Sequence, residues 1–257
     1  TIPDTHNIRP LEMAVWYPAA TTAQPKLIAD NLVFIGVLAV PDAAPTPGKH
    51  PVVVLSHGYG GNWGKQAWLA SALARQGYIV AAVNHPGTTS QDRSAQAAAQ
   101  LWQRPKDLSR AIDALLAQAT PFGAADSGRI AVIGHSLGGW TVMESAGARF
   151  DPALFARDCD AHPTLVACKA YREMNPEGTP SGKAQVAADL SDKRVTAVVS
   201  LDLGLSRGFT NASLAALPVP ALVIAAGVPS ADLPAQMESA DMAKRLPKTS
   251  TQYVEIQ

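Results

Sequence analysis

The feature that most constrains this chain is a serine held between two glycines directly after a short apolar run. Residues 130–133 (IAVI) are uncharged and rich in β-branched side chains, which is typical of a buried strand. They lead into Gly134-His135-Ser136-Leu137-Gly138, after which residues 140–148 favour a helix. A strand, a Gly-x-Ser-x-Gly turn and a helix predict a strained turn that exposes the serine hydroxyl. We therefore expect Ser136 to be a nucleophile; the alternative is a glycine-rich turn whose serine has no chemical role.

A second glycine-rich turn follows an earlier apolar run. Residues 51–56 (PVVVLS) are predicted to form a buried strand, and they end in His57-Gly58-Tyr59-Gly60-Gly61. We expect the main-chain amides of Tyr59 and Leu137 to form an oxyanion hole that holds the negative charge of a tetrahedral intermediate. We expect His57 to brace this turn through hydrogen bonds. The alternative is an ordinary turn without a catalytic role.

Strands and helices alternate along the rest of the chain. Further strands are predicted at 11–17, 78–83, 195–201, 221–226 and 252–256, and helices at 63–76, at 91–118 with a break near Pro105, and at 236–246. Residues 32–40 fit a helix turn, a strand or part of a pocket rim. The pattern predicts an α/β fold in which helices flank a mostly parallel central sheet, with functional residues at the carboxyl ends of the strands. We expect one domain over 1–257, with 150–192 as an inserted cap of short helices.

The amino-acid composition limits which binding partners and which cellular compartment are expected. The 21 basic and 21 acidic residues give a net charge of zero, so nothing favours binding to nucleic acid or to an anionic membrane. No apolar run approaches the roughly 20 residues of a membrane span. Cys159 and Cys168 are nine positions apart and are expected to form a disulfide in a periplasmic or secreted protein, with two free thiols as the alternative. No spacing of four ligands predicts a metal site.

Three stretches of the chain resemble a known family. Residues 55–61, 77–85 and 130–139, in this order and at similar spacing, look like the platelet-activating-factor acetylhydrolase and predicted dienelactone hydrolase branch of the α/β-hydrolases. Arg9-Pro10-Leu11 and Arg104-Pro105-Lys106-Asp107 resemble its bacterial members. The resemblance implies the α/β-hydrolase fold, a Ser-His-Asp triad that cleaves small carboxylic esters, and no cofactor. Dienelactone hydrolase itself uses a cysteine, so its lactone specificity is not implied.

The acid of such a triad has two candidates. Asp202 directly follows the strand predicted at 195–201, which resembles the acid position of the acetylhydrolase branch. Asp232 lies in the loop after the strand predicted at 221–226, where many other α/β-hydrolases carry the acid. We favour Asp202 as catalytic. For either residue the alternative is a turn or helix-capping aspartate.

The general base is not evident. All six histidines precede Asp202, whereas the family places its histidine just after the last strand. We expect a truncated or processed chain whose own esterase activity is impaired because the triad histidine is missing. His85 is the best substitute among the histidines present. The remaining alternative is a non-catalytic ligand-binding relative, and an amidase, thioesterase or polyester hydrolase would use the same machinery.

Overall fold

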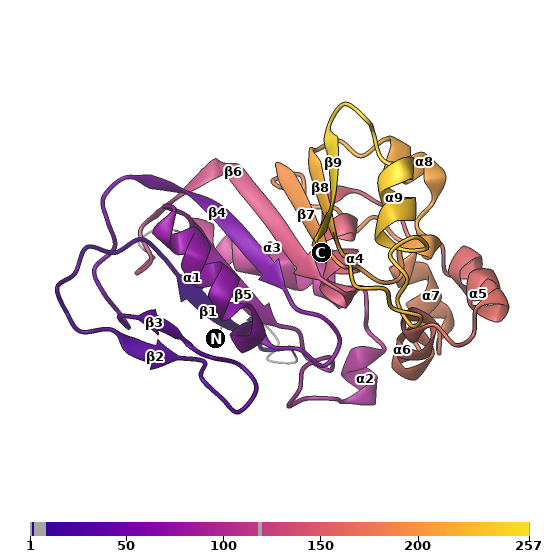
Figure 1. Ribbon diagram of the computed structural model, residues 1–257, viewed down its shortest axis with the longest axis horizontal. Helices are drawn as coiled ribbons and strands as arrows, with labels where there is room; N and C mark the ends of the chain where they lie inside the picture. The colour runs from indigo at the N-terminus through magenta and orange to yellow at the C-terminus, as the bar shows by residue number, and fades with distance from the viewer. Residues whose placement is uncertain (1, 3–8, 118–119, 257) are drawn as a thin grey trace.

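A seven-stranded sheet forms the centre of the computed structural model, which describes residues 2, 9–117 and 120–256. Its strand order is β1-β5-β4-β6-β7-β8-β9 (Figure 1). The edge strand β1 runs antiparallel to β5, and every other neighbouring pair in this sheet is parallel. The strands are β1 (Glu12–Trp16), β4 (Lys49–Ser56), β5 (Ile79–Asn84), β6 (Ala124–His135), β7 (Ala197–Leu201), β8 (Ala221–Ala226) and β9 (Thr251–Ile256). The predicted mostly parallel α/β sheet is therefore confirmed.

Helices cover the two faces of this sheet unequally. On one face α1 (Ala67–Arg75) packs against β1, β4 and β5 through a small apolar core. The other face carries a larger core shared by α3 (Gln103–Leu116), α4 (Leu137–Ala146) and α9 (Ser239–Arg245). Since both faces of the central strands are covered, β5 is buried at every position, and its residues 79–83 form a continuous apolar run.

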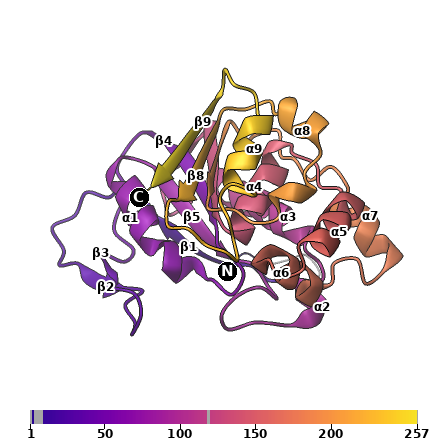
Figure 2. The same ribbon diagram turned by 45° about the vertical axis from the view of Figure 1, so that its right-hand side comes forward.

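The segment between α4 and β7 folds into three short helices, as predicted. They are α5 (Pro152–Ala161), α6 (Val166–Met174) and α7 (Pro180–Val186), and they group together at one side of the molecule (Figure 2). The rings of Phe150, Phe155 and Tyr171 in this segment and of Phe209 after η2 form four contacting pairs, with ring centroids 5.0 to 6.1 Å apart. The Phe150 ring also meets Trp140 of α4, so the segment is fixed to the helix that follows Ser136.

Other boundaries differ from the predictions. Residues 32–40 span a bend and then β3 (Val37–Ala39), which pairs with β2 (Lys26–Ile28) in a separate hairpin. The helix predicted at 63–76 begins as the short helix η1 (Trp63–Gln66). The break predicted near Pro105 falls earlier, between α2 (Ala95–Ala98) and α3. Pro105 lies in the first turn of α3, where a missing N–H leaves no helical hydrogen bond unmade.

The remaining short elements follow β7. They are η2 (Ser206–Gly208) and α8 (Asn211–Ala215). The predicted end of the helix at Gln118 lies outside the described residues. In the part of the chain that the structure describes, every helix is too short or too polar to cross a bilayer.

Candidate active site

Ser136 lies in the sharp turn between β6 and α4. Its backbone has φ 53° and ψ −118°, a strained conformation for a residue with a side chain. The turn requires its flanking glycines, because a Cβ on Gly134 would lie 2.0 Å from the Gly138 carbonyl oxygen. A Cβ on Gly138 would likewise lie 2.0 Å from the carbonyl oxygen of Ser56. The main-chain N–H of Ser136 donates to Leu201 O at 2.9 Å, which ties the turn to the end of β7.

The glycine-rich turn after β4 lies against this serine. A Cβ on Gly58 would lie 3.1 Å from the Cβ of Ser136. The Gly58 carbonyl oxygen accepts from His57 Nδ1 at 2.7 Å and from the N–H of Gly61 at 2.9 Å. Because the C=O and N–H of a trans peptide point in opposite directions, these bonds also fix the direction of the Tyr59 N–H. Among the described residues, that N–H has no protein acceptor.

His57 holds the turn after β4 in place through both of its ring nitrogens. It is 1% exposed, and its Nε2 accepts the main-chain N–H of His85 at 3.0 Å, so the ring proton is on Nδ1 and is donated to Gly58 O. Burial lowers the pKa of His57 well below its usual value, and the Arg104 cation lowers it further. A neutral, hydrogen-bonded His57 agrees with the bracing role expected from the sequence.

The two candidate acids lie in different surroundings. In the register of β6 and β7, His135 pairs with Leu201, so Ser136 and Asp202 each follow the last pair of two neighbouring strands. Asp202 has φ 44°, and its Oδ1 accepts the N–H of Ala226 at 3.3 Å. Asp232 is exposed in the loop after β8, where its carbonyl oxygen accepts a hydrogen bond from α6.

His85, the substitute base considered from the sequence, belongs to another group of residues. Its Nε2 lies 2.9 Å from Ser56 Oγ and its Nδ1 lies 3.0 Å from Asp107 Oδ2. This is a second Ser-His-Asp arrangement, but Ser56, His85 and Asp107 are each 0% exposed. The suggestion that His85 serves Ser136 is therefore wrong, because both of its ring nitrogens are used inside the core and no substrate reaches them.

Two charged residues beside the Ser56-His85-Asp107 group drew attention in the sequence only through the family resemblance. Arg9 forms a two-pronged ion pair with Asp107, at 3.0 Å from Nε and 2.7 Å from Nη2. Arg104, in the first turn of α3, is 1% exposed and points toward the same region. No periodicity could have located these contacts, because Arg9 and Asp107 are 98 positions apart.

Tyr59 also connects the turn after β4 to the three-helix segment. Its hydroxyl donates to Glu173 Oε1 of α6 at 2.8 Å, and the Arg93 guanidinium lies 5.0 Å from the centre of its ring. Burial and the Glu173 carboxylate raise the pKa of Tyr59. The residue expected to supply an oxyanion donor through its main chain thus contacts a second element through its side chain.

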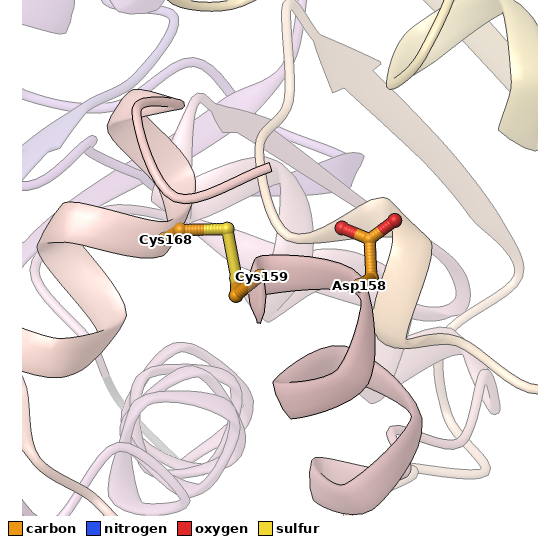
Figure 3. A group of neighbouring side chains, drawn as sticks. All are labelled: Asp158, Cys159 and Cys168. Carbon is orange, nitrogen blue, oxygen red and sulfur yellow. A yellow bond between two sulfur atoms is a disulfide. The ribbon is translucent and has the colours of Figure 1, made fainter. Parts of the chain in front are cut away.

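The predicted disulfide between Cys159 and Cys168 is present and joins α5 to α6 (Figure 3). Asp158 lies beside this pair, and the three side chains are close enough together to suggest a cation site. Both sulfur atoms are consumed by the disulfide, and Asp158 Oδ2 instead meets Arg207 Nε at 2.7 Å. The group is therefore a structural link.

A large hollow among the described residues lies away from the serine. It has a volume of about 850 Å³ and lies between β1 and the β2–β3 hairpin, with Trp16, Trp63 and Leu38 among its walls. Neither Ser136 nor Asp202 lines it. This hollow and the strained turn at Ser136 are therefore separate features of the molecule.

The mostly parallel sheet with helices on both faces and the serine turn after β6 have the α/β-hydrolase fold. Residues 48–156 match the family described as "Serine aminopeptidase, S33". A ferulic acid esterase from Streptomyces cinnamoneus has the same fold, with a TM-score of 0.65 and 23% identity over 96% of this chain and 66% of that one.

Curated relatives match a shorter part of the chain. A bis(hydroxyethyl) terephthalate hydrolase of Streptomyces coelicolor is 33% identical over 102 residues, which are 40% of this chain and 30% of the relative. Cutinase est1 of Thermobifida alba is 32% identical over 101 residues, 38% of this chain and 31% of the cutinase. A platelet-activating factor acetylhydrolase of Cavia porcellus is 28% identical, over 44% of this chain and 37% of its own. The chain spans about a third of the length of each of these curated relatives.

Proposed function

We propose that this protein is a serine hydrolase that cleaves carboxylic esters through an acyl-enzyme on Ser136. The observation that carries the proposal is the pairing of a strained Ser136 with the fixed Gly58–Tyr59 peptide beside it. Strained backbone conformations of this kind concentrate at catalytic sites. The names of the relatives, which include cutinases and a terephthalate-ester hydrolase, support an ester as the substrate.

The reaction follows from this arrangement. Ser136 Oγ attacks the ester carbonyl, and the resulting oxyanion accepts hydrogen bonds from the N–H groups of Tyr59 and Leu137. Leu137 is the first residue of α4, so its N–H has no partner within the helix and lies at the positive end of the helix dipole. The alcohol departs, and water then releases the acid from Ser136.

Asp202 is the proposed acid of the triad. It follows β7 at the same edge of the sheet as Ser136, and the Ala226 N–H holds one of its carboxylate oxygens. Its other oxygen, Oδ2, has no hydrogen-bond partner among the described residues. That oxygen is the group that would orient a histidine ring, which is the acid's role in this kind of triad.

The proton acceptor is proposed to reach Ser136 from beyond β9. Among the described residues, no histidine ring hydrogen-bonds the Ser136 hydroxyl. β9 runs parallel to β8, and Ile256 pairs with Ala226 next to Asp202. A histidine on a loop following this strand would enter at the edge that holds Ser136 and Asp202. Without an acceptor the hydroxyl stays protonated, and the triad's contribution, on the order of a million-fold, is lost.

The disulfide also supports a location. Disulfides persist in oxidising compartments and are rare in reducing ones. The Cys159–Cys168 bond therefore supports a periplasmic or secreted protein. The proposed substrate is an ester of small size or an ester bond in a polymer, and no cofactor is needed for this chemistry.

Labelling with a fluorophosphonate, together with hydrolysis of p-nitrophenyl butyrate, tests the proposal. With imidazole present as the proton acceptor, we expect Ser136→Ala to abolish labelling and Ser56→Ala to retain it, because Ser56 is buried although it has a His-Asp pair beside it. Imidazole hydrolyses p-nitrophenyl esters without an enzyme, so the S136A rate is subtracted at each imidazole concentration. We expect the remaining rate of the wild type to rise with imidazole. Labelling that persists in S136A would disprove the nucleophile. A chain that binds esters without labelling or turnover at any imidazole concentration would be a ligand-binding relative.

A further inference from the structure

Arg104 is a buried cation whose hydrogen bonds converge on the turn after β4 and on α4. It donates from Nε to Thr141 Oγ1 at 2.9 Å and from Nη1 to Thr88 Oγ1 at 2.5 Å. Its Nη2 donates to Ser56 Oγ at 3.3 Å and to the carbonyl oxygen of His57. A guanidinium presents its donors in a rigid planar fork, so four acceptors around it are held in fixed relative positions.

Two of these acceptors belong to the segments that carry the proposed oxyanion donors. The His57 carbonyl lies directly before the Gly58–Tyr59 peptide. Thr141 links Arg104 to the start of α4, because its hydroxyl accepts from Arg104 and donates to the Leu137 carbonyl oxygen at 3.0 Å. The planar head of Arg104 therefore joins the peptide unit before Tyr59 to the first residue of α4.

Thr88 adds a third link to the same turn. Its carbonyl oxygen accepts the N–H of Gly60 at 2.9 Å, while its hydroxyl accepts from Arg104. The turn that contains Tyr59 is thus held on both sides of that residue, through His57 and through Gly60, by groups that contact one guanidinium.

The charge of Arg104 is balanced through a chain of hydrogen bonds. The Ser56 hydroxyl accepts from Arg104 and donates to His85 Nε2. His85 in turn donates from Nδ1 to the Asp107 carboxylate, which also accepts a hydrogen bond from Arg9. Burial lowers the pKa of Arg104 to about 9, which leaves it protonated at neutral pH. Burial also lowers the pKa of His85 well below its usual value, so His85 makes both of these hydrogen bonds as a neutral ring.

We propose that Arg104 is a positioning residue that sets the spacing of the Tyr59 and Leu137 amides. The inference rests on the proposed function, because it concerns the oxyanion hole of the same site. An oxyanion hole is effective only when its donors are placed for the developing charge, and removal of one donor typically slows catalysis about 100- to 1,000-fold. A side chain that holds the two segments less firmly than Arg104 would shift both donors from these positions. We expect such a shift to slow catalysis by less than the removal of a donor does.

The experiment compares Arg104→Lys with Arg207→Lys. Arg207 is the matched control, because it is also buried and ion-paired but contacts Asp158 and Glu238 beside the three-helix segment. Rates are measured with p-nitrophenyl butyrate at one fixed imidazole concentration, after subtraction of the S136A rate. We expect R104K to lower kcat by roughly 10-fold or more with KM within about two-fold, and R207K to leave kcat within about two-fold, since only R104K disturbs the oxyanion donors.

The pH profile separates positioning from a general loss of structure. A buried lysine loses its proton more readily than an arginine, so kcat of R104K should decline at a lower pH than that of the wild type. If R104K does not fold, Thr141→Val decides the question, because it removes only the hydroxyl between Arg104 and Leu137 O. We expect T141V to lower kcat by about three- to ten-fold, a part of the effect of a lost donor.

The outcomes distinguish the two proposals. A wild-type rate equal to that of S136A would overturn the proposed function itself. A rate that depends on Ser136 but is unchanged in folded R104K and in T141V would overturn the positioning role alone. A decrease in kcat of similar size in R207K would show that any buried arginine has this effect, which also contradicts the inference.

Discussion

The hydroxyl of Tyr59 donates a 2.8 Å hydrogen bond to the carboxylate of Glu173, and this bond joins the turn beside Ser136 to helix α6. The contact involves the side chain of Tyr59, whereas the proposed oxyanion donor is its main-chain N–H. The two roles can therefore be separated by substitution.

Removal of the Tyr59 hydroxyl should leave the chemistry almost intact. We expect Tyr59→Phe to change kcat for p-nitrophenyl butyrate by less than about three-fold, because the main-chain donor is retained. The lost hydrogen bond is partly exposed and should cost about 0.5–1 kcal/mol in the free energy of unfolding. Steady-state kinetics and thermal unfolding of Y59F measure both effects. A hundred-fold loss of kcat would mean that the phenol itself takes part in the reaction.

The serine turn should not tolerate a methyl group at its first glycine. In Gly134→Ala the added Cβ would lie 2.0 Å from the Gly138 carbonyl oxygen, a contact that only movement of the backbone can relieve. Overpacking of this kind costs about 1–3 kcal/mol or more, and we expect a lower Tm together with loss of fluorophosphonate labelling. Gly128→Ala is the control, because its nearest contact, 3.4 Å from Asp126 Oδ1, is ordinary. Normal labelling of G134A would contradict the structure of the turn.

Glu144 should make stability depend on pH. It is 0% exposed in α4, and burial raises its pKa well above the usual value while the Arg149 cation opposes the shift. An acid whose pKa is higher in the folded state stabilises the fold while protonated. Its contribution is complete below the unfolded pKa and is lost as the pH rises through the folded value.

We therefore expect the Tm of the wild type to fall between pH 5 and pH 8 more steeply than that of Glu144→Gln. For a chain of this size each kcal/mol corresponds to about 2–4 °C in Tm. Differential scanning calorimetry across this pH range provides the measurement. Parallel curves for the two proteins would show that Glu144 does not titrate over this range in the fold.

The Cys159–Cys168 disulfide should contribute to stability more than to chemistry. It closes a loop with a sequence separation of 9, for which the chain-entropy estimate is about 2–3 kcal/mol. We expect the double substitution to alanine to lower Tm by roughly 5–10 °C. The rate of Ser136 labelling below the transition should change by less than about two-fold, since neither sulfur contacts Ser136. An unchanged Tm, or a labelling rate that falls in parallel with reduction, would contradict this division.

Local pattern sufficed for the elements that hold Ser136. The apolar run 130–133 predicted a buried strand, and Gly134 reflects a clash with Gly138, four residues further along the same turn. The cysteine pair is also local, since nine positions separate its members. Such features depend on backbone sterics and on short-range chain geometry, which a single sequence contains.

Long-range contacts required the folded structure. His85 was a reasonable substitute base by its position at a strand end, yet the fold turns it toward Asp107 and Ser56 in the core. The family resemblance marked Arg9 and Arg104, but the sequence could not give their partners.

By itself, then, the sequence determined the α/β architecture and the serine turn, because periodicity and glycine sterics act between near neighbours. For the two cysteines it favoured a disulfide over two free thiols. Only the tertiary structure decided that Arg104 bonds the two segments beside Ser136 and that the Ser56-His85-Asp107 group is sealed from solvent. The physical reason is that burial and hydrogen-bond direction arise when distant strands and helices pack together, and no local pattern encodes which polar groups then meet.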